Sequence, residues 1–241
     1  MHSRLQRTEL HHWWFVARRK IIFDLILMQL PQHHRTQILD VGCGTGCNIQ
    51  KLNSHGYNNV IGLDISQAAL RFCQTQNVKK TVCGDVILLP FPDNSFDMSL
   101  ALDLIEYVQD DLAALKELAR ILKPGGSLVI FAPAYKFLWS FHDEAKHHIR
   151  RYEINDLQSK MQQAGLSITK LTYANTFLFP LVFAERIITR VMGRPKYINS
   201  EDDLHPSWSS MFLRNTFAFE SSLLRHIDFP FGVSIICIAR K

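Results

Sequence analysis

Short apolar runs alternate with amphipathic segments along residues 37–131, and this alternation predicts βαβ units. The runs Ile38–Val41 and Val60–Leu63 have the length and the side chains of buried strands. Helices are expected behind the strands at residues 48–55, 66–76 and 110–122. Parallel strands need such crossover helices, so the pattern indicates an α/β fold with a parallel sheet.

The segments on either side of this region extend the same domain. Residues 9–30 have the spacing of a helix that ends at Pro31, and residues 166–173 alternate like a strand. We expect one domain over residues 1–241, with an N-terminal helical lid at 1–36, a core at 37–173 with a loop insertion at 133–152, a helical insertion at 174–232 and a last strand at 233–241. These insertions would cover the carboxyl ends of the parallel strands, where open α/β sheets bind ligands.

Composition narrows the class of protein. Of the 241 residues, 47% are hydrophobic and 20% are charged, which predicts a packed core. Residues 1–7 lack the apolar core of a signal peptide, and the longest apolar stretch, 174–192, contains three charged residues. The five cysteines include no Cys-x-x-Cys pair. We therefore expect a soluble, cytoplasmic protein with reduced thiols.

The net charge of +5 is spread thinly along the chain. No recognised nucleic-acid-binding module accompanies it, so nucleic acid is not the expected partner.

A loop with glycine at every second position follows the first strand. It reads Gly42-Cys43-Gly44-Thr45-Gly46, and it has no side chain at three positions to keep a ligand away from the main chain. Asp64 stands at the end of the second apolar run, where a carboxylate can accept both hydroxyl groups of a ribose. The loop and the acid together predict a nucleoside ligand.

The spacing of the glycines separates two classes of nucleoside. A dinucleotide-binding loop reads G-x-G-x-x-G, but here Cys47 takes the place of the third glycine. The G-x-G-x-G pattern instead resembles motif I of class I S-adenosylmethionine-dependent methyltransferases. The resemblance continues in order at Asp64 and at residues 84–86, 96–103 and 122–130.

This resemblance implies a Rossmann-like sheet of seven strands with helical lid insertions, ending in an antiparallel hairpin of strands six and seven. It also implies S-adenosyl-L-methionine as the cofactor. The residues that would hold the cofactor on this basis are Asp40, Gly42, Gly44, Gly46, Asp64, Ile65, Asp85, Val86 and Asp103.

Two further segments resemble a bacterial subgroup of type 11 methyltransferases. One is a Trp-Phe-x-x-Arg entrance at Trp14–Arg18, and the other is a His-Asp, His, Arg-Arg-Tyr stretch at 142–152. Arg18 would pair with the cofactor's carboxylate, as guanidinium groups commonly do. The ring of Trp14 could face the sulfonium cation or pack on the core.

Methyl transfer requires a held donor and often the removal of a proton from the acceptor. His142 is our candidate base, with Asp143 to orient it and His147 as a second candidate, because imidazole titrates near neutral pH. Asp143 and His147 are four residues apart, as are Glu144 and His148, so each pair would meet on a helix. A divalent metal site and a polar lid with salt bridges to the arginine pair at 150–151 are the alternatives; we expect no metal.

Tyr107 stands after the fourth strand, where the resembled family typically carries histidine. A phenol has an unperturbed pKa near about 10, so it would be a better hydrogen-bond donor than base. Tyr107 either takes part in catalysis or packs against the donor.

These features predict a methyltransferase that acts on an oxygen or nitrogen of a small or lipid-like molecule. Residues 174–232 would line an apolar acceptor pocket, form a dimer surface, or lie on a membrane with basic side chains at the headgroups, namely Arg186, Arg190, Arg194 and Lys196. The sequence does not indicate an oligomeric state. The alternative functions are a non-catalytic partner that binds the cofactor and a nicotinamide-dependent oxidoreductase.

Overall fold

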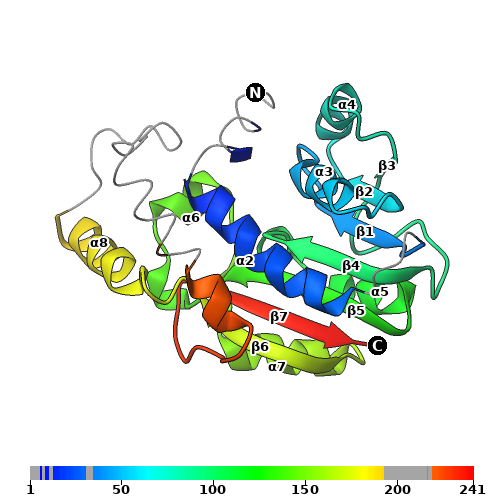
Figure 1. Cartoon of the computed structure of the whole chain (residues 1–241). Helices are drawn as coiled ribbons and strands as arrows, with labels where there is room; N and C mark the ends of the chain where they lie inside the picture. The colour runs from blue at the N-terminus through cyan, green and yellow to red at the C-terminus, as the bar shows by residue number, and fades with distance from the viewer. Residues whose placement is uncertain (1–5, 7–8, 11–12, 31–34, 193–215, 217–218) are drawn as a thin grey trace.

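Seven strands form one sheet in the order β3-β2-β1-β4-β5-β7-β6 (Figure 1). The structure is a computed structural model that describes residues 6, 9–10, 13–30, 35–192, 216 and 219–241. The strands are β1 (Ile38–Val41), β2 (Val60–Asp64), β3 (Thr81–Cys83), β4 (Phe96–Leu102), β5 (Leu122–Pro133), β6 (Ser167–Ala174) and β7 (Ser234–Arg240). The first five strands pair in parallel, and β7 runs antiparallel to both β5 and β6. The expected Rossmann-like sheet of seven strands is confirmed.

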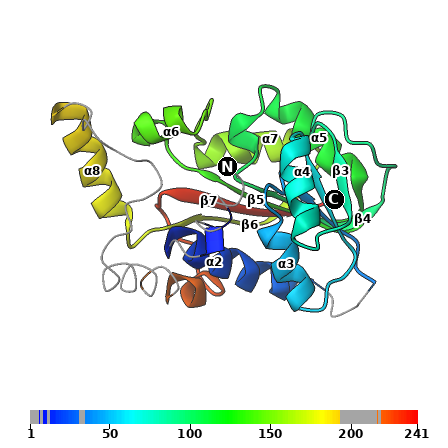
Figure 2. The ribbon, with the colours of Figure 1, turned by 90° about the horizontal axis from the view of Figure 1, so that it is seen from above.

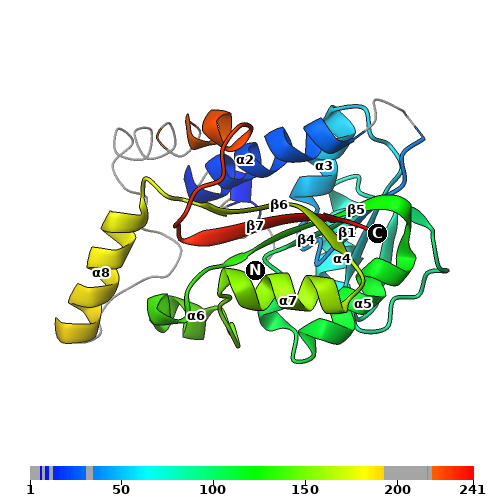
Figure 3. The ribbon, with the colours of Figure 1, turned by 90° about the horizontal axis from the view of Figure 1, so that it is seen from below.

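Helices cover both faces of the sheet. They are α2 (Trp13–Gln29), α3 (Cys47–Ser54), α4 (Gln67–Thr75), α5 (Asp111–Ile121), α6 (Phe141–Ala145), α7 (Ile154–Gln163) and α8 (Phe179–Met192), with 3₁₀ turns η1 (Ile105–Tyr107) and η2 (Lys136–Leu138). Figures 2 and 3 show α2 and α3 on one face and α5 and α7 on the other. Each face has its own buried apolar cluster, so the sheet is the middle layer of three.

Side-chain caps fix where two of these helices begin. The Ser66 hydroxyl accepts a hydrogen bond from the Ala69 amide at the start of α4. The Asp110 carboxylate accepts one from the Ala113 amide at 2.9 Å at the start of α5. Such caps satisfy amides that have no partner within the helix. Both loops that precede these helices are therefore held at the carboxyl edge of the sheet.

The segment 123–126 is part of β5. Phe96 of β4 pairs with Leu122, but Met98 pairs with Ser127, so the intervening residues form a bulge. Gly125 has φ of 79°, a conformation that glycine adopts without strain. The bulge lets the strand continue where a turn would have ended it.

The loop after β5 contains only short helical segments. Helix α6 spans only Phe141–Ala145, and His147 has φ of 60°, which is incompatible with a continuing helix. A capping box at Ser140 and Asp143 begins the short helix. The expected helical pairing of Asp143 with His147 is therefore wrong.

Helix α8 leads away from the sheet after β6 (Figure 1, yellow). Apolar side chains on it are exposed, with Leu181 at 62% and Ile188 at 53%. In the membrane alternative Arg186 was expected to face lipid headgroups. Its side chain is not free to do so, because it is only 13% exposed and pairs with Glu185. Arg194 and Lys196 lie outside the described residues. Within the described ranges, none of the helices combines the length and apolar character needed to cross a bilayer.

Gly62 in the middle of β2 provides a test of packing beneath the glycine loop. A Cβ at this position would lie 2.7 Å from Ile49 Cδ1 and 2.8 Å from Cys43 Sγ. Gly62→Ala is expected to lower the free energy of unfolding by about 1–3 kcal/mol through overpacking. Thermal unfolding would show this as a fall of about 2–4 °C per kcal/mol.

Gly84→Ala is the matched control, because its Cβ would meet Leu63 no closer than 3.2 Å. An equal loss of stability in both variants would contradict the packing explanation.

Candidate functional site

The loops after β1 and β4 meet at the carboxyl edge of the sheet, where the strand order reverses. A Cβ on Gly42 would lie 2.9 Å from Leu104 Cδ1, so the two loops are in contact. Gly42, Gly44 and Gly46 have φ values of 70°, 53° and 82°, in the left-handed region. A side chain at these positions would strain the backbone. A crevice at such a reversal is the usual ligand site of open α/β sheets.

Asp64 links the glycine loop to the start of α4. Its Oδ2 accepts a hydrogen bond from the Gly44 amide at 2.9 Å, and its Oδ1 accepts one from the Ser66 amide at 2.8 Å. Each carboxylate oxygen keeps a second lone pair that can accept a ribose hydroxyl. Beside it, the Ile65 side chain is 70% exposed and Asp85 is exposed, whereas Val86 is buried. An apolar surface flanked by carboxylates fits a nucleoside.

Three charged side chains meet between α2, β1 and β4. Arg18 of α2 forms an ion pair with Asp103, and its guanidinium carbon lies 5.4 Å from the centroid of the Phe131 ring. Burial lowers the pKa of Arg18 to about 10 and raises the pKa of Asp40 to about 7. Arg18 Nε and Asp40 Oδ2 are buried and have no hydrogen-bond partner among the described residues. Orphaned polar atoms are rare in folded proteins, and here they fit a site for a polar ligand.

The N-terminal segment reaches the same place. The carboxylate of Glu9 accepts a hydrogen bond from the Thr45 hydroxyl in the glycine loop. Nothing in the sequence spacing indicates this contact, because the two residues are far apart in the chain. Trp14 belongs to α2, but its side chain lies outside the described part of the structure.

Asp143 is the centre of a buried polar network in the loop after β5. Its Oδ1 accepts hydrogen bonds from Arg151 Nε at 2.8 Å and from His148 Nδ1 at 3.0 Å. Its Oδ2 accepts one from the Ser140 amide at 2.9 Å. These donors outweigh burial and hold the pKa of Asp143 well below its usual range. Its histidine partner is therefore His148, whereas His147 is exposed.

Tyr107 joins this network from the loop after β4. Its hydroxyl lies 3.1 Å from His148 Nε2, and the two rings meet edge to face with centroids 4.9 Å apart. The Tyr107 side chain is nevertheless partly open, since the residue is 42% exposed. Burial of the hydroxyl raises the pKa of Tyr107 to about 12, so the phenol is protonated at neutral pH.

His142 lies apart from these hydrogen bonds, on the other side of Asp143 in the chain. Its ring centroid is 3.9 Å from that of Phe141. Burial, and then the charges of Arg186 and Lys146, lower the pKa of His142 to about 4. The imidazole is therefore neutral at physiological pH, and its role as a base stays a prediction.

Glu106 is a buried acid that the sequence analysis did not select. The residue is 0% exposed, and within the part of the chain that the structure describes neither side-chain oxygen has a hydrogen-bond partner in another residue. Burial raises its pKa to about 8, although Arg18, Lys146 and Arg151 favour the charged form. The only signal in the sequence was its place directly before Tyr107 at the end of the β4 loop.

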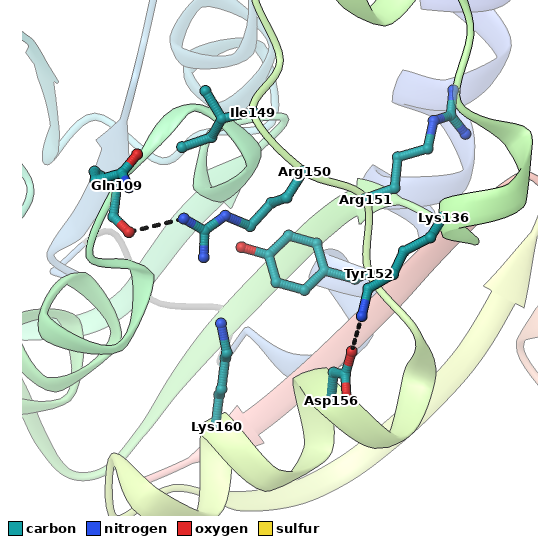
Figure 4. Close-up of a pocket in the computed structure, with 8 residues that line it drawn as sticks. All are labelled: Gln109, Lys136, Ile149, Arg150, Arg151, Tyr152, Asp156 and Lys160. Atoms are coloured by element: carbon teal, nitrogen blue, oxygen red, sulfur yellow. Dashed lines mark hydrogen bonds and ion pairs between the residues drawn. The ribbon is translucent and has the colours of Figure 1, made fainter.

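A pocket of about 270 Å³ lies next to the loop after β5. Figure 4 shows the residues that line it, which are Gln109, Lys136, Ile149, Arg150, Arg151, Tyr152, Asp156 and Lys160. The cations of the pocket are paired within the protein. Lys136 pairs with Asp156 at 3.0 Å, and Arg150 and Lys160 share Asp111. These contacts join the loop to α5 and α7, so we assign the pocket a structural role.

The histidine spacing left a metal site open as an alternative. Across the described ranges, no group of three or more His, Cys, Asp or Glu side chains is arranged to hold a metal ion.

Comparison with known proteins adds to this geometry. Residues 39–130 match the family profile of a methyltransferase domain. The chain is 36% identical over 150 residues to the biotin biosynthesis bifunctional protein BioHC of Cellvibrio japonicus, covering 58% of this chain and 30% of that protein. It is 31% identical over 162 residues to 24-methylenesterol C-methyltransferase 2 of Oryza sativa, covering 60% of this chain and 44% of that protein. The chain thus spans less than half the length of these relatives.

Solved structures share the fold at lower identity. An S-adenosylmethionine-dependent methyltransferase from Mesorhizobium loti superposes with a TM-score of 0.62 at 16% identity, covering 92% of this chain and 98% of that one. The [4+2]-cyclase SpnF superposes with a TM-score of 0.61 at 21% identity, covering 93% of this chain and 80% of that one. At these identities the likeness concerns the fold alone.

The raised pKa of Glu106 predicts a pH-dependent effect on stability. Folding holds a proton on Glu106 that the unfolded chain releases, so this residue makes the wild type less stable as pH rises from about 5 to about 8. Glu106→Gln removes that penalty. Relative to wild type, the variant is expected to gain at most about 1.4 kcal/mol per pH unit in this window.

Urea unfolding at three pH values would measure this effect, with Glu185→Gln on α8 as the control. A stability difference that does not change with pH would contradict the assignment.

Proposed function

Because the chain carries a class I S-adenosylmethionine-dependent methyltransferase domain, we propose that the protein transfers a methyl group from S-adenosylmethionine to an oxygen or nitrogen of a small or lipid-like acceptor. The observation that supports this most strongly is the Asp64 carboxylate, which ties the Gly44 amide and lies beside the exposed Ile65. When bound, the cofactor supplies an electrophilic methyl group on a sulfonium.

The proposed cofactor site runs across the ends of β1, β2, β3 and β4. The main chain at Gly42, Gly44 and Gly46 lies along the nucleoside, and Asp64 accepts the ribose hydroxyls. Ile65 and the segment 85–86 flank the adenine. At the other end of the site, the Arg18 guanidinium would bind the carboxylate of the methionine portion. The carboxylates of Asp40 and Asp103 would bind its ammonium group.

A row of aromatic rings supports an apolar acceptor. Tyr135 stacks on Phe137 with centroids 4.9 Å apart and on Tyr173 at 5.0 Å, and Phe137 meets Phe183 of α8 at 6.0 Å. Phe137 is 46% exposed, so the row opens to the surface. Such a surface suits a bulky or lipid-like molecule. Peripheral contact of α8 with a membrane belongs to the same proposal.

Non-catalytic binding of the cofactor is the second candidate function. The structural neighbour SpnF is a cyclase, and this shows that the fold alone does not determine methyl transfer. Release of S-adenosylhomocysteine separates the two functions, since only turnover produces it.

We expect calorimetry to detect binding of S-adenosylmethionine, with no comparable binding of NAD. Asp64→Asn is expected to weaken the affinity about 10- to 100-fold, because it removes charge-assisted hydrogen bonds worth about 1.5–3 kcal/mol. Asp156→Asn, an exposed acid on α7, is the matched control. Wild-type protein that binds neither the cofactor nor S-adenosylhomocysteine would contradict the proposal.

Turnover is tested with protein-free and lipid extracts of cells as the source of acceptor. We expect release of S-adenosylhomocysteine from S-adenosylmethionine that depends on the extract. If the cofactor binds and no extract supports its conversion, the binding-only function holds instead.

A further inference from the structure

Three side chains from separate segments form a single line of hydrogen bonds at the edge of the site. Asp143 of α6 bonds to His148 at 3.0 Å, and His148 bonds to Tyr107 of η1 at 3.1 Å. We propose that Tyr107, backed by His148 and Asp143, takes the proton from a methyl acceptor that arrives with its O–H or N–H intact. This inference rests on the proposed function and names the acceptor's chemical class and the route of its proton.

The direction of each hydrogen bond follows from the charge of Asp143. The carboxylate is ionised, so it can only accept, and His148 Nδ1 must be the donor. A neutral imidazole has one N–H, which leaves Nε2 as an acceptor. The Tyr107 hydroxyl must then donate its only hydrogen to Nε2.

This order decides what a ligand can offer to Tyr107. The phenol oxygen keeps lone pairs but has no hydrogen left, so its partner must be a donor. A hydroxyl or an N–H group meets this requirement. A carboxylate or a tertiary amine has no hydrogen to give, and a carbon nucleophile makes at best a weak hydrogen bond. The line of bonds therefore selects a nucleophile that is still protonated when it binds.

Exposure along the line supports the same order. The Asp143 side chain is 1% exposed and that of His148 is 10% exposed, whereas Tyr107 is 42% exposed. Only the phenol faces open space to a large extent. It does so on the β4 loop, whose Leu104 contacts the glycine loop and whose Asp103 pairs with Arg18. The loop that carries the phenol thus borders the proposed cofactor site.

Main-chain and side-chain contacts hold the line rigidly. The Ile149 amide donates to the Glu106 carbonyl at 2.9 Å, so the residues next to His148 and Tyr107 are joined directly. Arg151 fixes Asp143 and also donates to the Ala134 carbonyl at 3.0 Å. Groups that move a proton need such fixed geometry.

Methyl transfer and proton transfer are coupled in the proposed step. The acceptor atom bonds to the methyl carbon as the carbon–sulfur bond breaks, and that electron pair stays on sulfur. The acceptor's proton moves to Tyr107 Oη while the phenol proton moves to His148 Nε2. His148 is then positively charged beside the Asp143 carboxylate until water removes the proton. The phenol remains neutral throughout, which agrees with its raised pKa of about 12.

His142 is the rival base, and its surroundings disfavour the charge that a base acquires. A protonated His142 would face Arg186, Lys146 and Arg151, which together with burial outweigh the Asp143 carboxylate and lower its pKa to about 4. A protonated His148 would face the Asp143 carboxylate at 3.0 Å. The two histidines therefore differ in the charges that they face.

The first test needs no acceptor. Nitrogen-15 NMR of the full chain with S-adenosylhomocysteine bound is expected to show His148 protonated at Nδ1 and bare at Nε2. Tyr107→Phe should shift the Nε2 resonance, and Asp143→Asn should remove the hydrogen-bonded Nδ1 proton. His148→Gln assigns the signals, and His226→Gln, an exposed histidine, is the control. A ring protonated at Nε2, or no shift in Tyr107→Phe, would overturn the proposal.

The second test follows turnover with pH, using the protein-free cell extract that supports release of S-adenosylhomocysteine. The relay needs a free acceptor nitrogen on His148, so the dependence of kcat on pH should change when Tyr107 or His148 is replaced. Tyr107→Phe and His148→Gln should lower kcat by about 100-fold or more. Affinity for S-adenosylmethionine should stay within about twofold of wild type, because neither side chain is assigned to the cofactor.

Rescue distinguishes proton transfer from a merely structural role. Tyr107→His places an imidazole directly on the open side, so in the His148→Gln background it should restore part of the lost kcat. If Tyr107→Phe and His148→Gln keep the wild-type rate and pH profile, or if only His142→Ala changes that profile, the relay is wrong while the proposed function stands. If wild type binds the cofactor but never turns over, the proposed function fails and the relay fails with it.

Discussion

The buried pair of Asp143 and Arg151 is the contact on which the loop after β5 depends. An ionised carboxylate that is 1% exposed is costly unless donors surround it, and here the donors come from Ser140, His148 and Arg151. Supplying them forces the chain to leave the helix at His147, where φ is 60°. The same demand brings His148 against Tyr107. One desolvated charge thus shapes both the loop and the polar line that it carries.

Three other ionisable groups at the site, Arg18, Asp40 and Glu106, are kept at a cost to stability. Burial raises the pKa values of Asp40 and Glu106 and lowers that of Arg18, so each is held in an environment that opposes its charge. A core built only for stability would have apolar residues here. Interactions between charges are also stronger where water is excluded. The arrangement suits a ligand that brings several charges of its own, as the methionine portion of the cofactor does.

Periodicity and glycine spacing were enough to predict the parallel strands, most helices and the loop after β1, because these features depend on local patterns. The seven-stranded sheet with its antiparallel hairpin was expected from the family resemblance. The loop at 139–152 was predicted less well. Spacing of four residues suggested Asp143 with His147, but the Ser140 capping box and the buried Arg151 decided the actual partner. The pattern Ser140-x-x-Asp143 was a signal that could have placed the helix start. The contact between Glu9 and Thr45 and the burial of Glu106 depend on tertiary packing, which the spacing of residues in the sequence does not encode.

Tyrosine at position 107 changes what the neighbouring residues must do. An imidazole there could accept a proton itself. The phenol, whose pKa is raised to about 12, keeps its own proton at neutral pH, and a neutral phenol is too weak a base to hold a second one. It can only pass a proton on, so it needs a base behind it. That base lies at 3.1 Å in His148, and His148 in turn has a carboxylate at 3.0 Å that stabilises its charged form. Tyr107 and the polar line behind it therefore belong to one arrangement. In it, the proton acceptor His148 lies behind the phenol that meets the ligand.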